Sequence, residues 1–168
     1  PILDGGCCEI GLESTVLDLS TEVPRVLRLG PISSGEIELV LERRVLTSTQ
    51  ILEQDEKSSK SPGNSFKHYA PQTPLILHQN VHLLKVSKKI SPKDVIIVPF
   101  ENEIPLLENK GMQVLSLSRS ISHWKIAKNL YSKLRQADKM NASSMHLALI
   151  QGEEGITKAI NDRLIRAS

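Results

Sequence analysis

The feature that most constrains the fold of this chain is the alternation of short apolar runs with amphipathic helical patterns across residues 72–168. The run Val95–Pro99 is apolar throughout, as expected of a strand buried on both faces of a sheet. Further strands are predicted near Leu75–Leu77, Met112–Leu117 and Met145–Ile150, and helices over Trp124–Ala137 and Ile156–Leu164. Because strands that alternate with helices form parallel sheets with right-handed crossovers, residues 72–168 are predicted to form a small doubly wound, Rossmann-like α/β domain.

Residues 1–46 carry the elements of a different unit. Strands are predicted at Ser14–Leu19 and Pro24–Leu29, and a Gly-Pro turn follows the second. Ser33 and Glu36 have the spacing of a capping box, which predicts a helix from this point into the Arg-Arg pair. Two strands and one helix are too few to close a core, and the sequence opens without an initiator methionine. We therefore expect these residues to be the C-terminal part of a larger α/β domain.

Residues 47–71 are predicted to be a linker, because most of them are polar and show no periodicity. The end of this segment has a different character. Phe66–Pro71 places two of the few aromatic residues, a lysine and a histidine in one loop, and His68 and Tyr69 are adjacent there. A plain spacer would not need such side chains, so we expect this loop to have a function.

Charge and cysteine content limit the partners and the compartment. The net charge is +2 with 24% charged residues, a balance that does not by itself indicate a nucleic-acid-binding protein. No apolar run approaches the roughly 18 residues of a membrane-spanning helix, and no signal peptide is recognised. Cys7 and Cys8 are adjacent and cannot cross-link a fold, which favours a reducing, cytoplasmic location.

No metal site is predicted from the histidines. His78 and His82 have a spacing that binds zinc on a helix, but no Glu or Cys accompanies them, and they follow a predicted strand. His123 and His146 belong to no recognisable constellation. A loose run of lysines over residues 85–93 is more typical of a solvated surface than of an RNA site.

Three side chains are candidates for ligand binding. Ser14 follows several glycines, which let the backbone approach a ligand closely; the alternative is an ordinary turn into a strand. Arg28 ends an apolar strand, where a buried guanidinium needs an anion such as phosphate; the alternative is an exposed arginine. His68 has the chemistry to bind phosphate or move a proton, or it is a packing residue. No residue is singled out as a catalytic acid or base.

The order of the motifs resembles the two-domain threonylcarbamoyl-AMP synthase family. These motifs are Asp-Gly-Gly (4–6), Gly-Leu-Glu-Ser-Thr-Val-Leu-Asp (11–18), Val-Leu-Arg-Leu-Gly-Pro-Ile (26–32), Pro-Gly (62–63) and Lys-His-Tyr-Ala-Pro (67–71), followed by Leu-Tyr-Ser-Lys-Leu-Arg-Gln-Ala-Asp (130–138) and Ala-Ile-Asn-Asp-Arg-Leu (159–164). The resemblance implies that residues 1–46 are the C-terminal part of a YrdC-type catalytic domain. It also implies that residues 47–71 are the linker and residues 72–168 the C-terminal domain.

The resemblance implies an activity and a set of site residues. The family condenses L-threonine, bicarbonate and ATP to threonylcarbamoyl-AMP and pyrophosphate, and the adenylate serves modification of tRNA at position 37. By similarity, Ser14 would contact threonine. Arg28, His68 and Tyr69 would bind ATP, with Mg²⁺ at the phosphates. The resemblance further implies that the macromolecular partners would be tRNA or the other tRNA-modification proteins.

Three departures from the family pattern bear on activity. Leu29 stands where the family often has proline, and Asn64-Ser65-Phe66 stands where many members have Met-Lys-Tyr, which removes a hydroxyl that could reach the ligand. The Lys-x-Arg substrate-binding motif of the N-terminal half is absent from these residues. We therefore expect the 168 residues alone not to make the adenylate. The alternatives are a non-catalytic module that binds a nucleotide, RNA or a partner protein, and a YrdC-type domain serving carbamoyl transfer in hydrogenase maturation, which the C-terminal extension fits poorly.

Overall fold

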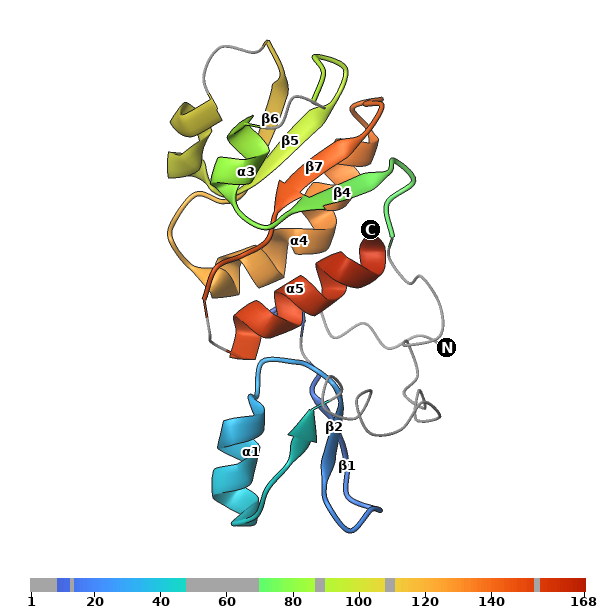
Figure 1. Cartoon of the computed structure of the whole chain (residues 1–168), viewed down its shortest axis with the longest axis vertical. Coiled ribbons are helices and arrows are strands. Elements are labelled where there is room, and N and C mark those ends of the chain that lie inside the picture. Colours follow the sequence, from blue (N-terminus) through green and yellow to red (C-terminus); the bar gives the residue numbers. More distant parts are fainter. Residues whose placement is uncertain (1–8, 13, 48–69, 87–89, 108–110, 153–154) are drawn as a thin grey trace.

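The computed structural model describes residues 9–12, 14–47, 70–86, 90–107, 111–152 and 155–168. Two lobes follow one another along the long axis of the molecule, a small three-stranded sheet with one helix and a larger four-stranded sheet with helices (Figure 1). The elements are β1 (Val16–Asp18), β2 (Arg25–Arg28), α1 (Ser34–Leu41), β3 (Leu46–Thr47), β4 (Leu75–His78), α3 (Val81–Val86), β5 (Val95–Phe100), η1 (Glu101–Leu107), β6 (Gln113–Ser118), α4 (His123–Asp138), β7 (Met145–Ala148) and α5 (Gly155–Ala167).

The four-stranded sheet has the order β4-β7-β5-β6, and every pairing in it is parallel. The two inner strands are the most buried, because both of their faces are covered: Val95 and Ile97 of β5 and Leu147 of β7 are fully buried. The predicted parallel α/β sheet is confirmed. All four strands predicted for this lobe are present, with bounds shifted by a few residues.

Helices cover both faces of this sheet and create two cores. On one face α4 and α5 bury the larger core, which includes Ile126, Leu130, Ile160 and Leu164. On the other face α3 and η1 cover a smaller core around Ile96, Val98, Leu107 and Ala148. This two-sided arrangement is what a doubly wound domain requires.

The small sheet is a mixed sheet in the order β1-β2-β3, with β1 antiparallel and β3 parallel to β2. Helix α1 begins as predicted: Ser33 is the N-cap and forms a capping box with Glu36. No residue of α1 is buried, and Leu39 and Val40 are 82% and 83% exposed. A helix without a buried face is expected of an incomplete domain, and the division of the chain at residues 46 and 71 stays a prediction.

Three short elements and one helix end escaped the sequence patterns. Strand β3, helix α3 and the 3₁₀ helix η1 were not predicted, because each is too short to show a clear period and η1 contains Pro105. Helix α1 ends at Leu41, ahead of the two arginines, because Glu42 adopts a left-handed conformation (φ 53°). No helix in the described part of the chain is long and apolar enough to cross a membrane.

Candidate functional site

The structure brings Ser14 and Arg28 together. Strand β1 runs antiparallel to β2 with Val16 opposite Arg28, so Ser14, just upstream of β1, lies beside the arginine side chain. The Arg28 Nη2 donates a hydrogen bond of 2.6 Å to the Ser14 Oγ. Two residues singled out from separate motifs are therefore neighbours in the fold.

The Arg28 guanidinium keeps unused donors at this point. Its Nε is buried and has no hydrogen-bond partner among the described residues. Nor does a described carboxylate form an ion pair with Arg28. A buried donor that makes no hydrogen bond is unfavourable, because its desolvation is then uncompensated. An anionic ligand that accepts from the guanidinium would remove this penalty, and phosphate matches the geometry of the fork.

Gly30 fixes the backbone that carries both residues. A Cβ at Gly30 would lie 2.4 Å from the Thr15 N and 2.5 Å from the Ser14 carbonyl carbon, so only glycine allows this approach. The Thr15 Oγ1 also donates a hydrogen bond of 3.1 Å to the Ile32 carbonyl oxygen. The residues that follow β2 are thus packed directly onto those that precede β1.

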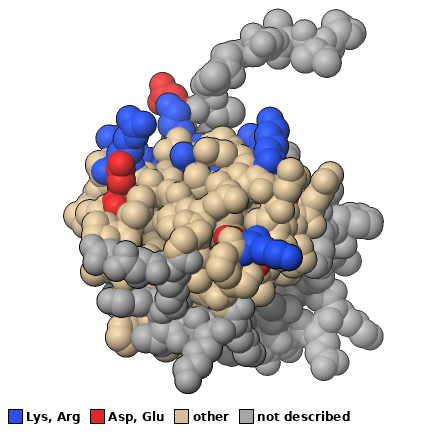
Figure 2. All heavy atoms as spheres, turned by 90° about the horizontal axis from the view of Figure 1, so that it is seen from above, with Lys and Arg blue, Asp and Glu red and all other residues tan. Residues whose placement is uncertain are grey.

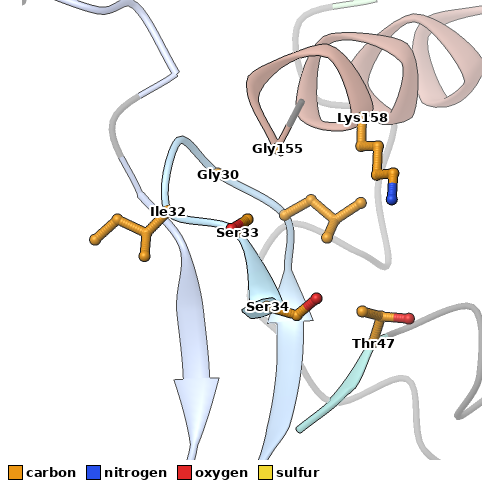
Figure 3. Close-up of a pocket in the computed structure, with 8 residues that line it drawn as sticks. Gly30, Ile32, Ser33, Ser34, Thr47, Gly155 and Lys158 are labelled. Atoms are coloured by element: carbon orange, nitrogen blue, oxygen red, sulfur yellow. The ribbon is translucent and has the colours of Figure 1, made fainter. Parts of the chain in front are cut away.

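A cavity of about 190 Å³ lies beside this site, between the small sheet and α5. Figure 3 shows Lys158 reaching from α5 on one side and the Ser34 and Thr47 side chains on the other. Its lining also includes Leu29 and Gly30, but neither Ser14 nor Arg28. Ligand pockets for drug-sized molecules measure about 300 Å³ or more, so this cavity is too small for a nucleotide.

His68 and Tyr69, the other predicted ATP-binding residues, lie outside the described residues. Their role therefore stays a prediction. The cysteines and the Asp-Gly-Gly motif are also outside the described ranges.

Sequence reasoning missed a buried polar chain in the four-stranded sheet. His78 at the end of β4 and His146 in β7 share a hydrogen bond of 2.9 Å between Nε2 and Nδ1. The His146 Nε2 lies 3.0 Å from the Ser144 Oγ, which donates to the Asp94 Oδ1 at 2.9 Å. The signal available in the sequence was the Ser-x-His spacing of Ser144 and His146, which places both on one side of a strand.

The hydrogen bonds of this polar series all run in one direction, from His78 to Asp94. Because the Ser144 hydroxyl donates to Asp94, its oxygen accepts from the His146 Nε2, and the His146 Nδ1 then accepts from His78. Burial opposes ionisation of Asp94, but hydrogen bonds from Ser91 and Ser144 outweigh it and lower its pKa. Burial lowers the pKa of both histidines, and for His78 the neighbouring His146 adds to the effect. These hydrogen bonds therefore stabilise the sheet while both histidines are neutral.

The described residues contain no group of three or more His, Cys, Asp or Glu side chains arranged to hold a metal ion. Nor does the face in Figure 2 carry a continuous basic surface: its described lysines and arginines stand in separate groups around a broad uncharged area.

Comparison with known proteins gives the chain a family. The family model described as "Threonylcarbamoyl-AMP synthase, C-terminal domain" matches residues 32–168. The chain is 31% identical to the threonylcarbamoyl-AMP synthase of Pyrococcus abyssi and 30% identical to that of Bacillus subtilis, in each case over 99% of the chain and 48% of the relative. The protein of that name from Schizosaccharomyces pombe is 28% identical, over 99% of the chain and 44% of the relative. The chain thus spans about half the length of these relatives.

Solved structures agree with this assignment. The crystal structure of P. abyssi Sua5 complexed with L-threonine superposes with a TM-score of 0.73 at 26% identity, over 98% of this chain and 48% of that chain. A double variant of the same archaeal protein gives 0.63 at 23% identity and supports the fold alone. With the motif order, the parallel α/β fold and the match over residues 32–168, the chain belongs to the threonylcarbamoyl-AMP synthase family and carries its C-terminal domain.

Proposed function

We propose that this chain is the C-terminal half of an L-threonylcarbamoyladenylate synthase, a nucleotidyltransferase that joins L-threonine, bicarbonate and ATP and releases pyrophosphate. The product would be used for threonylcarbamoyladenosine formation at position 37 of tRNA in the cytoplasm. The observation that carries the proposal is the Ser14–Arg28 pair, in which a partly buried guanidinium retains an unpaired Nε. Family membership supports it, and the solved Sua5 relative is a complex with L-threonine.

Ser14 and Arg28 have complementary tasks in this proposal. Ser14 is exposed and offers a hydroxyl that binds the threonine substrate. Arg28 grips the phosphates of ATP, because its planar guanidinium presents parallel donors to phosphate oxygens. The 2.6 Å bond between the two side chains would then place threonine and ATP next to each other.

The chemistry demands positioning and charge stabilisation rather than covalent catalysis. The threonine nitrogen takes up the carbon of bicarbonate to form a carbamate, with loss of water. A carbamate oxygen then attacks the α-phosphorus, and the bond to the bridging oxygen of pyrophosphate breaks. Negative charge develops on the phosphate oxygens, where Arg28 would stabilise it. We propose no general acid or base among the described residues.

Mg²⁺ would assist by neutralising the ATP phosphates. Magnesium bound to nucleotides keeps several waters and takes only one or two carboxylates from the protein, so the lack of a metal-holding cluster in the described ranges is compatible with it. His68 and Tyr69 belong to the same proposal: their loop would fold over the nucleotide and exclude water from the hydrolysable adenylate.

The first test replaces Arg28 by alanine in the full-length gene product and measures pyrophosphate release with threonine, bicarbonate and ATP. Loss of a charged phosphate contact should raise the ATP KM or lower kcat by about 10²-fold. The matched control is Arg44→Ala, which removes an exposed arginine after α1. Unchanged kinetics for Arg28→Ala would remove this residue from the site.

Calorimetry distinguishes the proposed synthase from the alternative, a non-catalytic binding module. ATP and threonine are titrated into the full-length gene product and into the 168-residue piece in parallel. We expect binding and pyrophosphate release with the full-length protein only, because in this proposal part of the site would lie in the additional half that relatives about twice as long carry. If the full-length protein binds neither ligand, the synthase proposal is wrong.

A further inference from the structure

Helix α5 contacts the backbone of the candidate nucleotide site. The Arg163 Nη2 donates a hydrogen bond of 3.0 Å to the carbonyl oxygen of Leu29, the residue that follows Arg28. The two residues lie far apart in the sequence and in different lobes. The bond is shielded, since the Arg163 side chain is only 16% exposed.

Arg163 is itself held in place from the other side. Its Nη1 pairs with the Asp162 carboxylate, which also accepts from the Arg166 Nε at 3.0 and 3.1 Å. This network fixes the guanidinium, so the donor that meets Leu29 does not have to be ordered when the contact forms. The hydrogen bond to Leu29 is therefore donated by a guanidinium that the residues of α5 already hold in place.

The Leu29–Gly30 peptide unit is held on both sides. Arg163 binds its carbonyl oxygen, and on the other side Gly30 packs against the backbone of Ser14 and Thr15 without room for a Cβ. Because a peptide unit is planar and rigid, this also fixes the position of the Leu29 Cα, directly after strand β2 ends at Arg28. Helix α5 thus contacts the end of the strand whose pairing with β1 brings Arg28 to Ser14.

Two glycine contacts join the lobes on either side of this bond. Gly11, before β1, approaches the backbone of α4, where a Cβ would lie 2.7 Å from the Ala127 carbonyl oxygen. Gly155, at the start of α5, approaches Ser33, where a Cβ would lie 2.9 Å from the Ser33 Cβ. The small sheet has little core of its own with which to resist movement, since α1 buries no residue.

From these contacts we propose that Arg163 is a positioning residue: through the Leu29 carbonyl it holds Arg28 in the orientation that binds the ATP phosphates. The inference rests on the proposed synthase function and assigns the C-terminal domain a role in nucleotide binding. A bond that merely joins the two lobes would stabilise the protein without changing affinity for ATP.

The experiment compares Arg163→Met with Arg166→Met in the full-length gene product. Arg166 shares Asp162 but, in the described part of the chain, donates no hydrogen bond to the small sheet. We expect Arg163→Met to raise the ATP Kd and KM by about tenfold, the order expected for a charged hydrogen bond. Its kcat should fall by less than about threefold, because positioning affects ground-state binding first. Arg166→Met removes one of the two arginines bound to Asp162 but leaves the Arg163–Leu29 hydrogen bond in place, so it should change these constants less than Arg163→Met does.

Thermal unfolding of each variant shows whether a change in affinity reflects general destabilisation. If Arg163→Met fails to fold, Arg163→Gln is measured in its place, since its shorter amide side chain stays polar but cannot span the same gap. Wild-type affinity for ATP in either folded variant would overturn the positioning role while leaving the synthase proposal intact. Absence of ATP binding by the wild type would overturn both.

Discussion

At the scale of single residues, the small sheet depends on positions where a side chain is excluded as much as on those where one is present. Gly30 shows this best, because its two nearest neighbours, the Thr15 N and the Ser14 carbonyl carbon, are backbone atoms that cannot rotate away. Its φ is not in the left-handed region, so the requirement for glycine comes from the close approach and not from the backbone conformation.

Gly30→Ala is expected to destabilise the protein by about 1–3 kcal/mol, the range for overpacking, and to weaken threonine binding because Ser14 is displaced. Urea unfolding and threonine titration measure the two effects. Gly35→Ala is the matched control: nothing lies within 4 Å of its added Cβ, and it sits in α1, where alanine should stabilise by about 0.5–1 kcal/mol. Equal stability of the two variants would contradict this account of Gly30.

At the scale of elements, the strands and helices that could be predicted from the sequence are those with a long hydrophobic pattern or with a capping box at their start. The continuous apolar run gave β5, the 3.6-residue period gave α4, and Ser33 with Glu36 gave the start of α1. Helices α3 and η1 are held by their contacts with the sheet, which a local pattern does not contain. The Ser14–Arg28 contact follows from strand pairing, so motif order indicated the residues but not their hydrogen bond.

The paired strands β4 and β7 should make stability depend on pH. Both histidines have folded-state pKa values below the ordinary value, so below about pH 6.5 the unfolded chain binds protons that the folded sheet resists. We expect the urea midpoint to be constant from about pH 8 to 7 and to fall as the pH drops from about 6.5 to 5.

His78→Gln is expected to reduce that pH dependence, because it removes one of the two imidazoles that would have to charge beside each other. His82→Gln on α3 is the control, since His82 is exposed and lies outside the pair. A urea midpoint that falls equally in all three proteins between about pH 6.5 and 5 would refute the role of the pair.

At the scale of the whole molecule, the two lobes differ in how much apolar surface they bury among the described residues. The C-terminal lobe has a core on both sides of its sheet, whereas α1 exposes Leu39 and Val40 almost fully. Relatives about twice as long as this chain would have the additional sequence to cover such a face.

Leu39→Ser is therefore expected to act differently in two contexts. In the 168-residue piece the free energy of unfolding should change by less than about 0.5 kcal/mol, because the side chain is 82% exposed. In the full-length gene product it should fall by about 2 kcal/mol or more if the remainder of the catalytic domain packs on α1. Denaturant unfolding of the wild type and of Leu39→Ser, each in the 168-residue piece and in the full-length gene product, measures the two changes. An equally small change in both contexts would mean that α1 stays uncovered.

The glycine contacts between the lobes have a consequence for how such proteins can be recombined. Gly11 meets main-chain atoms of α4, and Gly155 meets the Cβ and main-chain atoms of Ser33, so a change of side-chain rotamer relieves neither contact. A C-terminal domain transplanted from a relative would therefore seat on this small sheet only if the donor brings glycine where α5 begins and the recipient keeps glycine ahead of β1. We therefore expect a library of domain exchanges to yield folded proteins mainly where both glycines are retained.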